Sequence, residues 1–311
     1  MKHIKLLISF IALFCVFAHP GTAASLPETA VSDGTNWIFH LNPSRFWQAN
    51  AGDRILEEMP DEARSNLKEL EKFFGSEPLN ALDGITLFGP DENEENAAVV
   101  LQGDFDRERI LNLVHLAEKH STEEYGDRTI HKWESKSDGE MRYGVFAAND
   151  TIILSRAKPP LTNALDVFDG EAPSIARGEL SNLIGEVPED AFMVSGVRGI
   201  SRLATDHGRA ALLKNVESLS TYAAERNCVL KLAGRLRASD GQAAERMAHT
   251  VRGIISLALL NPDVAESDLV PILEAIVVKT EGRELLLALD YPSDEFFAII
   301  QKMRRHKNVL K

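Results

Sequence analysis

The stretch "LDGITLFGPDENEENAAVVLQGDFDRERI" (residues 82–110) has a counterpart later in the chain, "VESLSTYAAERNCVLKLAGRLRASDGQAA" (residues 216–244). Each joins two apolar segments through a polar turn and then enters a helical pattern. The best local match aligns residues 99–106 with residues 230–237, so that Leu101 meets Leu232 and Gly103 meets Gly234. This order of residue types predicts a β-hairpin followed by a helix, written twice.

The flanking sequence extends the pattern in both directions. In the first half we expect a strand at 36–43, helices at 44–58 and 60–74, and a helix at 106–120 after the hairpin. Strands at 129–135, 141–147 and 151–155 and a helix at 159–168 follow. In the second half we expect a strand at 190–196, helices at 200–215 and 240–260, a hairpin at 275–290 and a closing helix at 292–305. The apolar end of the long helix, "GIISLALL" (253–260), is predicted to be buried.

These elements predict an α+β fold of two similar halves. Each half reads strand, helix, hairpin, helix, hairpin, helix, with a mainly antiparallel sheet covered by helices. The predicted boundaries are a signal peptide at 1–24, a first half at 25–170, a connecting segment rich in Pro and Gly breaks at 171–187, and a second half at 188–311. The alternative is that alternating strands and helices resemble each other without any duplication.

The N-terminus has the pattern of a secretory signal peptide. Basic Lys2 and Lys5 precede an apolar run at 6–18, and small Thr22 and Ala24 stand before a cleavage site at Ser25. The run is shorter than the roughly 20 residues that span a bilayer. We therefore expect export to the periplasm or beyond, no transmembrane span after cleavage, and an uncleaved anchor as the alternative.

Charge and cysteine content narrow the class of protein. The formal charge of the chain is −13, and removal of Lys2 and Lys5 gives −13 − 2 = −15. Such an acidic protein is not expected to bind nucleic acid through phosphate contacts. Cys15 leaves with the leader, so Cys228 has no partner for an internal disulfide, and its strand-like surroundings predict a small buried residue.

Several motifs together resemble a family of exported bacterial proteins of unknown function. They are the signal peptide, "LDGITLFG", the strand ending "LQGDFD", and "ILSRAKPPLTNALDVFDGEAPSIA" (153–176). The resemblance implies a bacterial envelope or extracellular location. It implies no catalytic residues.

The search for chemistry predicts no catalytic, cofactor-binding or metal-binding residues. The spacings of common zinc sites are absent, and His115 and His120, five apart on a predicted helix, are expected to face different directions. The acidic turn at 91–96 lacks the glycine of a calcium loop and is interpreted as a solvated hairpin tip. Two S-x-x-K matches, at 65–68 and 155–158, come without the other motifs of Ser–Lys enzymes and are interpreted as chance.

Aromatic residues offer one possible binding surface in the first half. Trp37, Trp47, Trp133 and Tyr143 could line a groove, although a core role is the alternative. The tail at 302–311 is basic and complements the dipole at the C-terminal end of its helix, or contacts anionic envelope polymers.

We therefore predict an exported, non-catalytic binding or scaffold protein of the bacterial envelope, whose partner is an unknown protein or envelope polymer. The alternative is an exported hydrolase whose site is assembled from scattered carboxylates and histidines.

Overall fold

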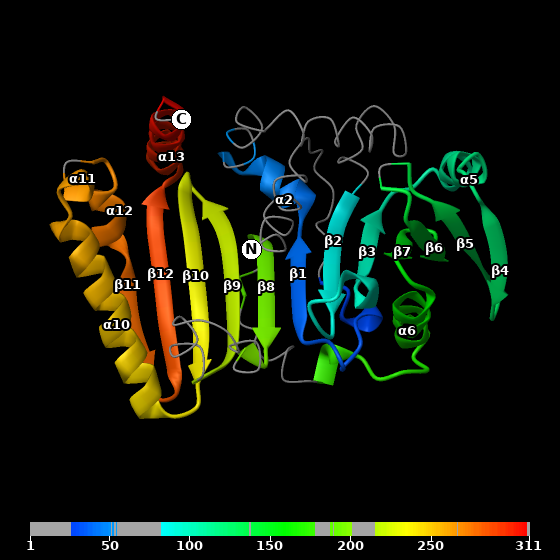
Figure 1. Cartoon of the computed structure of the whole chain (residues 1–311), viewed down its shortest axis with the longest axis horizontal. Coiled ribbons are helices and arrows are strands. Elements are labelled where there is room, and N and C mark those ends of the chain that lie inside the picture. The colour runs from blue at the N-terminus through cyan, green and yellow to red at the C-terminus, as the bar shows by residue number, and fades with distance from the viewer. Residues whose placement is uncertain are drawn as a thin grey trace. The chain divides into compact units, whose positions relative to one another are not determined.

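The computed structural model describes residues 26–50, 52, 54, 82–136, 138–177, 187–188, 190–200, 215–265 and 267–309 (Figure 1). The predicted signal peptide, the helix at 60–74 and most of the helix at 200–215 lie outside these residues. The chain forms two compact units. Within the described residues, the first unit contains 26–48 and 82–177, and the second contains 49–50, 52, 54 and the residues from 187 onward.

The first unit contains an antiparallel sheet of seven strands in the order β1-β2-β3-β7-β6-β5-β4. The strands are β1 (Trp37–Leu41), β2 (Leu82–Gly89), β3 (Ala98–Gly103), β4 (Ser121–Tyr125), β5 (Arg128–Glu134), β6 (Met141–Ala148) and β7 (Thr151–Ser155). The helices among its described residues are α2 (Pro43–Gln48), α5 (Arg107–His115) and α6 (Lys158–Phe168), with short 3-10 turns η1 (Glu28–Ala30), η2 (Glu94–Asn96) and η3 (Ile175–Arg177).

Helix α6 closes the core of this unit. Two prolines occupy its first turn, where their missing N–H groups cost no helical hydrogen bond. Leu161, Ala164 and Leu165 are spaced to share one helix face and are fully buried. The helix contacts β6, β7 and β3, where Val145 and Ile153 are also buried, so one face of the sheet is covered by α6.

The second unit contains five antiparallel strands in the order β11-β12-β10-β9-β8. The strands are β8 (Ala191–Arg198), β9 (Val216–Arg226), β10 (Val229–Ala238), β11 (Val277–Glu281) and β12 (Glu284–Pro292). The helices that the structure describes here are α10 (Gly241–Leu260), α11 (Pro262–Ala265), α12 (Val270–Ala275) and α13 (Ser293–Val309).

Helix α10 is only partly amphipathic. Asp240 caps it by accepting the N–H of Ala243 at 2.7 Å, and its N-terminal half buries Ala244 and Met247 against the sheet. The predicted burial of its apolar end is wrong, since Ile254, Leu257 and Leu260 are 57, 69 and 77% exposed.

The two units share an order of strands. Five strands of the first unit follow one another along the chain as β1, β2, β3, β6 and β7, and they lie in the sheet in the order β1-β2-β3-β7-β6. The five strands of the second unit, β8 to β12, lie in the corresponding order β8-β9-β10-β12-β11. In each unit a helix, α5 or α10, follows the central hairpin. The first unit adds the hairpin β4–β5 at its edge, and β4 was not predicted from the sequence. The α+β class and the mainly antiparallel pairing are confirmed.

Cys228 does not lie in a strand interior. It is exposed in the two-residue turn between β9 and β10, where Asn227 and Cys228 have φ of 54° and 60°. Positive φ at both positions defines the tight hairpin turn that matches strand twist. The prediction of a buried residue is wrong because the turn occupies residues 227 and 228, which the apolar pattern had assigned to the start of the second strand.

None of the helices in the described ranges combines the length and the apolar character that crossing a membrane requires.

Candidate functional site

Helix α5 ends five residues earlier than predicted, and this shortening creates a cluster of histidines. Its last residue is His115, and the turn that follows contains Lys119 at φ 51°. The carbonyl of Glu118 accepts the N–H of Glu134 at 2.9 Å, and the Lys119 ammonium pairs with the Glu134 carboxylate at 2.7 Å. The loop is thereby fixed to the end of β5, and the chain reverses into β4.

The reversal brings three imidazole groups together. His115 comes from the end of α5, His120 from the residue before β4, and His131 from β5. The three rings can each offer a nitrogen such that all three atoms lie within 4.8 Å of one another. Nε2 of His120 lies 3.2 Å from Nδ1 of His131. The prediction that His115 and His120 face different directions is wrong, because it assumed one continuous helix.

The rings differ in exposure and stack against one another. His115 is exposed, His120 is half-buried and His131 is 8% exposed. Their centroids are 5.0 to 5.6 Å apart, and the rings of His120 and His131 are stacked at 24°. Burial and the nearby His115 ring lower the pKa of His120.

The pKa of His131 is lowered first by burial and then by His120, His115 and Arg107, while Glu124 raises it. The neutral imidazole, which carries the lone pair that binds metals or protons, is therefore favoured at His131.

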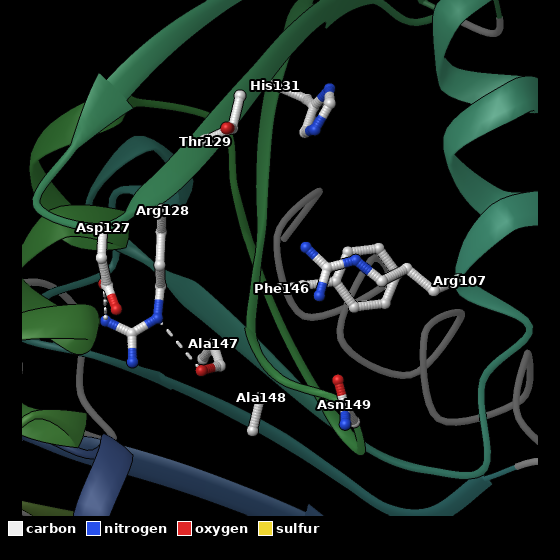
Figure 2. Close-up of a pocket in the computed structure, with 9 residues that line it drawn as sticks. All are labelled: Arg107, Asp127, Arg128, Thr129, His131, Phe146, Ala147, Ala148 and Asn149. Atoms are coloured by element: carbon white, nitrogen blue, oxygen red, sulfur yellow. Dashed lines mark hydrogen bonds and ion pairs between the residues drawn. The ribbon is translucent and has the colours of Figure 1, made fainter.

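A polar hollow of about 300 Å³ adjoins His131 (Figure 2). Its walls come from the start of α5, from the β4–β5 turn and β5, and from the end of β6. The residues that line it are Arg107, Asp127, Arg128, Thr129, His131, Phe146, Ala147, Ala148 and Asn149.

The two arginines of the hollow differ in their engagement. Arg128 forms a bidentate pair with Asp169 at 2.6 and 2.8 Å, and its Nε donates to the carbonyl of Ala147 at 3.1 Å. Arg107 lies with its guanidinium carbon 4.9 Å from the ring centroid of buried Phe146 (Figure 2). Within the described part of the chain, that guanidinium has no hydrogen bond or ion pair. Arg128 therefore joins β5 to β6 and to the residue that follows α6, whereas the N–H donors of Arg107 are available to a ligand.

The structure does not bring the four predicted aromatic residues to one surface. Trp37 lies in β1, where its Nε1 donates to the carbonyl of Asp91 at 2.6 Å, and Trp47 is buried in α2 against Phe46. In sheet order, β1 is separated from β6 by three strands.

Trp133 and Tyr143 lie on neighbouring strands but on opposite faces of the sheet. Trp133 pairs directly with Arg142, whereas Tyr143 pairs with Lys132, whose ammonium lies 5.5 Å from the Tyr143 ring centroid. Successive residues of a strand point to opposite faces, so no single groove contains all four side chains.

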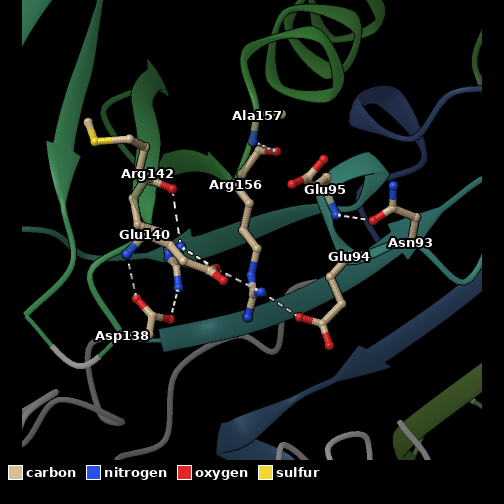
Figure 3. A network of polar contacts seen from close by, with 10 residues as sticks. Asn93, Glu94, Glu95, Asp138, Glu140, Arg142, Arg156 and Ala157 are labelled. Atoms are coloured by element: carbon tan, nitrogen blue, oxygen red, sulfur yellow. Dashed lines mark hydrogen bonds and ion pairs between the residues drawn. The ribbon is translucent and has the colours of Figure 1, made fainter.

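The remaining polar motifs are engaged in structure. Arg156 joins Glu94 of η2 to Glu140 beside β6 at 2.7 and 3.0 Å, and Arg142 extends the network to Asp138 (Figure 3). In the acidic turn, Asp91 accepts the backbone N–H of Asn93 and the side-chain amide of Asn96, each at 2.8 Å.

Ser155 of the second S-x-x-K match is buried and donates to the carbonyl of Ala97 at 2.9 Å, so it is not poised as a nucleophile. The first match, at 65–68, lies outside the described residues.

A local signal for the missed hairpin exists in the sequence. Gly126 and Asp127 separate "STEEY" from "RTIHKWE", and a Gly-Asp pair between two β-prone runs is typical of a two-residue hairpin turn. Gly126 has φ 59°, as that turn requires. The polar character of β4, whose first four residues are exposed, masked the signal.

The comparisons with known proteins show a fold relative but no family. No family model and no curated protein matches the chain. Crystal form III of TP0453 is similar over 90% of this chain and 100% of its own length, with a TM-score of 0.50 at 8% identity. Crystal form I of the same protein gives a TM-score of 0.49 at 10% identity, over 90% of this chain and 98% of its own length. At this identity the likeness shows the fold alone, which is consistent with a family of unknown function.

Proposed function

We propose that this chain is an exported, non-catalytic binding protein of the bacterial envelope, and that it holds an anionic group of its ligand in the hollow of the first unit. The observation that carries this proposal is Arg107, whose guanidinium is stacked over a buried ring and has no hydrogen-bond or ion-pair partner among the residues that the structure describes. A planar guanidinium presents a fork of N–H donors that fits a carboxylate or a phosphate.

The other polar groups of the hollow favour binding over hydrolysis. Asp127 pairs with Arg128 at 3.3 Å, and the Thr129 hydroxyl donates to Glu124 at 3.2 Å. Both side chains therefore have structural partners, whereas a nucleophile or general base needs its lone pair directed at the substrate. The volume of the hollow suits a small ligand or the anionic end of a larger one.

The test is calorimetric titration of the mature chain, residues 25–311, with inorganic phosphate and with acetate. Arg107→Ala should abolish the binding heat, and Arg107→Lys should weaken it because the ammonium keeps the charge but not the fork. Arg109→Ala, two residues along the same helix, is the matched control and should bind like the parent. Equal binding by Arg107→Ala and the parent would remove the hollow as the site.

Export is tested separately from binding. The N-terminal pattern supports cleavage after Ala24. When the full chain is expressed in a Gram-negative host, the periplasmic fraction should contain the protein with Ser25 as its first residue. A mass that includes the leader, or a cytoplasmic location, would contradict the proposal.

One observation favours the hydrolase alternative, namely the three imidazoles beside the hollow, since imidazole exchanges protons near neutral pH. A hydrolase should cleave some member of a panel of ester, phosphoester and peptide substrates, and His131→Gln should abolish that activity.

We also infer that the two units are related halves of a duplicated ancestor. The shared strand order and the position of α5 and α10 support this inference. An experimental structure in which β1-β2-β3-β7-β6 fails to superpose on β8-β9-β10-β12-β11 would contradict it.

A further inference from the structure

We propose that His115, His120 and His131 form a binding site for a divalent transition-metal ion, with zinc as the ion that they suit. The site is distinct from the anion-binding role of Arg107, and either can hold if the other fails. It rests on the convergence of three imidazole nitrogens from a helix end, a loop and a strand.

The distances fit a shared ion. Two ligands that each lie 2.0–2.1 Å from a tetrahedral zinc ion are about 3.3 Å apart. The Nε2 of His120 and the Nδ1 of His131 are 3.2 Å apart. The three imidazoles can each offer a nitrogen such that the three atoms lie within 4.8 Å of one another. The pair therefore already has the separation of two ligands, and the third needs to move in by at most about 1.5 Å to complete the set.

The third ligand is the one best able to move. His115 is exposed at the last residue of α5, and helix ends fray more readily than helix interiors. His131, by contrast, is held in β5 between Thr122 of β4 and Gly144 of β6, and His120 directly precedes β4. Two ligands are thus positioned by the sheet and one is delivered by the helix.

The chemistry of the donors favours zinc, copper or nickel over calcium or magnesium. Neutral imidazole suits borderline metals, whereas calcium and magnesium prefer oxygen ligands. The neutral form of imidazole is the one that binds a metal. Charges of both signs adjoin the site: the positive charge of Arg107 repels a cation there, and the negative charge of Glu124 attracts one.

Three protein ligands leave a fourth position on a tetrahedral ion for water or a small ligand. His131 also lines the hollow that contains Arg107. An anion bound to the metal could therefore be shared with the hollow, although metal binding does not require it.

The competing explanation is a hydrogen bond between two imidazoles. A neutral His120 ring that donates its N–H to His131 would also give the 3.2 Å separation. That explanation assigns no role to His115 and predicts no response to metal.

The experiment is a calorimetric titration of the untagged mature chain, stripped with EDTA, with zinc chloride. We expect one ion per chain. His115→Ala, His120→Ala and His131→Gln should each lower the affinity by more than about 100-fold, because even a partner behind a ligand is worth 10- to 100-fold. His249→Ala is the matched control, since His249 is exposed on α10 of the second unit, and it should bind like the parent.

A second readout separates metal ligation from folding. Cobalt added to the stripped parent should give the intense visible absorption of a tetrahedral ion, and zinc should displace it. Circular dichroism without metal shows whether each variant folds, and His115→Ala, at an exposed position, is the variant that should keep its fold. No binding heat with zinc, unchanged affinity in folded His115→Ala, or an equal loss in His249→Ala would overturn the proposal.

Discussion

The two units of this protein arrange five strands in the same order, and they differ at the edge of the first sheet. There the hairpin β4–β5 extends the sheet beyond β6, whereas in the second unit helices α11 and α12 precede β11, and no strand of the described ranges lies beyond β11. Several residues of the candidate sites lie in or beside this hairpin. His120 precedes the added hairpin, and His131 and Arg128 lie in it, whereas His115 and Arg107 belong to α5. The candidate site therefore combines the added hairpin with a helix whose place in the chain order is shared by both units.

The comparison predicts that zinc stabilises the first unit and not the second. At a free zinc concentration 100 times the Kd, the stabilisation should be about 2.7 kcal/mol. Hydrogen exchange should slow in α5, β4 and β5 and stay unchanged in β9 to β12. The His115→Ala chain, treated identically, should show no protection, and equal protection of both units would break the comparison.

Glycines in the two sheets should respond differently to an added methyl group. A Cβ at Gly144 of β6 would lie 2.9 Å from Leu154 and 3.0 Å from Trp133, whereas one at Gly234 of β10 would meet nothing closer than 3.8 Å. Gly144→Ala should therefore cost about 1–3 kcal/mol of unfolding free energy through overpacking.

Gly234→Ala is the matched control and should change the stability by less than about 0.5 kcal/mol. Urea unfolding measures both variants, and tryptophan fluorescence should change only for Gly144→Ala because Trp133 is displaced. If Gly144→Ala leaves the unfolding free energy unchanged, Trp133 can move aside without destabilising the fold.

The turn of the second unit contains strain that the first unit's added hairpin avoids. Gly126 occupies a left-handed position in the β4–β5 turn, whereas Cys228 occupies one at φ 60° in the β9–β10 turn. Cys228→Gly relieves a steric cost of about 1–2 kcal/mol, partly offset by the entropy of glycine, so we expect a net gain of about 0.5–1 kcal/mol. Thermal unfolding measures it, and Cys228→Ser, which keeps the strain, should give no gain.

Two carboxylates, one in each unit, should shift stability with pH in opposite directions. Burial, then Asp104 and Asp150, raises the pKa of Asp83 in β2 above its ordinary value. A raised pKa means that the folded state binds the proton more tightly, so the contribution of Asp83 is present at low pH and is lost as the pH rises through the folded pKa. Asp83→Asn should therefore be more stable than the parent at pH 7, and the gain should shrink toward pH 4.

At the start of α10 the sign is reversed. The backbone N–H of Ala243 lowers the pKa of Asp240, so its contribution is present above the unfolded pKa and fades as the pH falls. Asp240→Ala should be less stable than the parent at pH 7, and the loss should shrink in acid. Unfolding midpoints between pH 4 and pH 7 measure both variants, and the same sign for the two would contradict the assignment.

The sequence by itself determined the α+β class, the hairpins at residues 82–103 and 216–238, and the helices α6, α10 and α13. Alternating apolar residues and turn signals are local, and they specify a hairpin without knowledge of the rest of the chain. The repeated order of elements stays a prediction from the sequence, drawn from local signals that recur in the second half, and the five-strand order shared by the two units is consistent with it.

Only the tertiary structure decided where the candidate site lies. Whether His115 and His120 diverge or converge depends on where α5 ends, and that end is fixed by the contact of Glu118 with Glu134, sixteen residues away in sequence. Likewise, Trp133 and Tyr143 fall on opposite faces because of the β5–β6 register, which pairs each with a different residue. Local patterns carry no information on such pairings, since a shift of one residue in register moves every side chain to the other face.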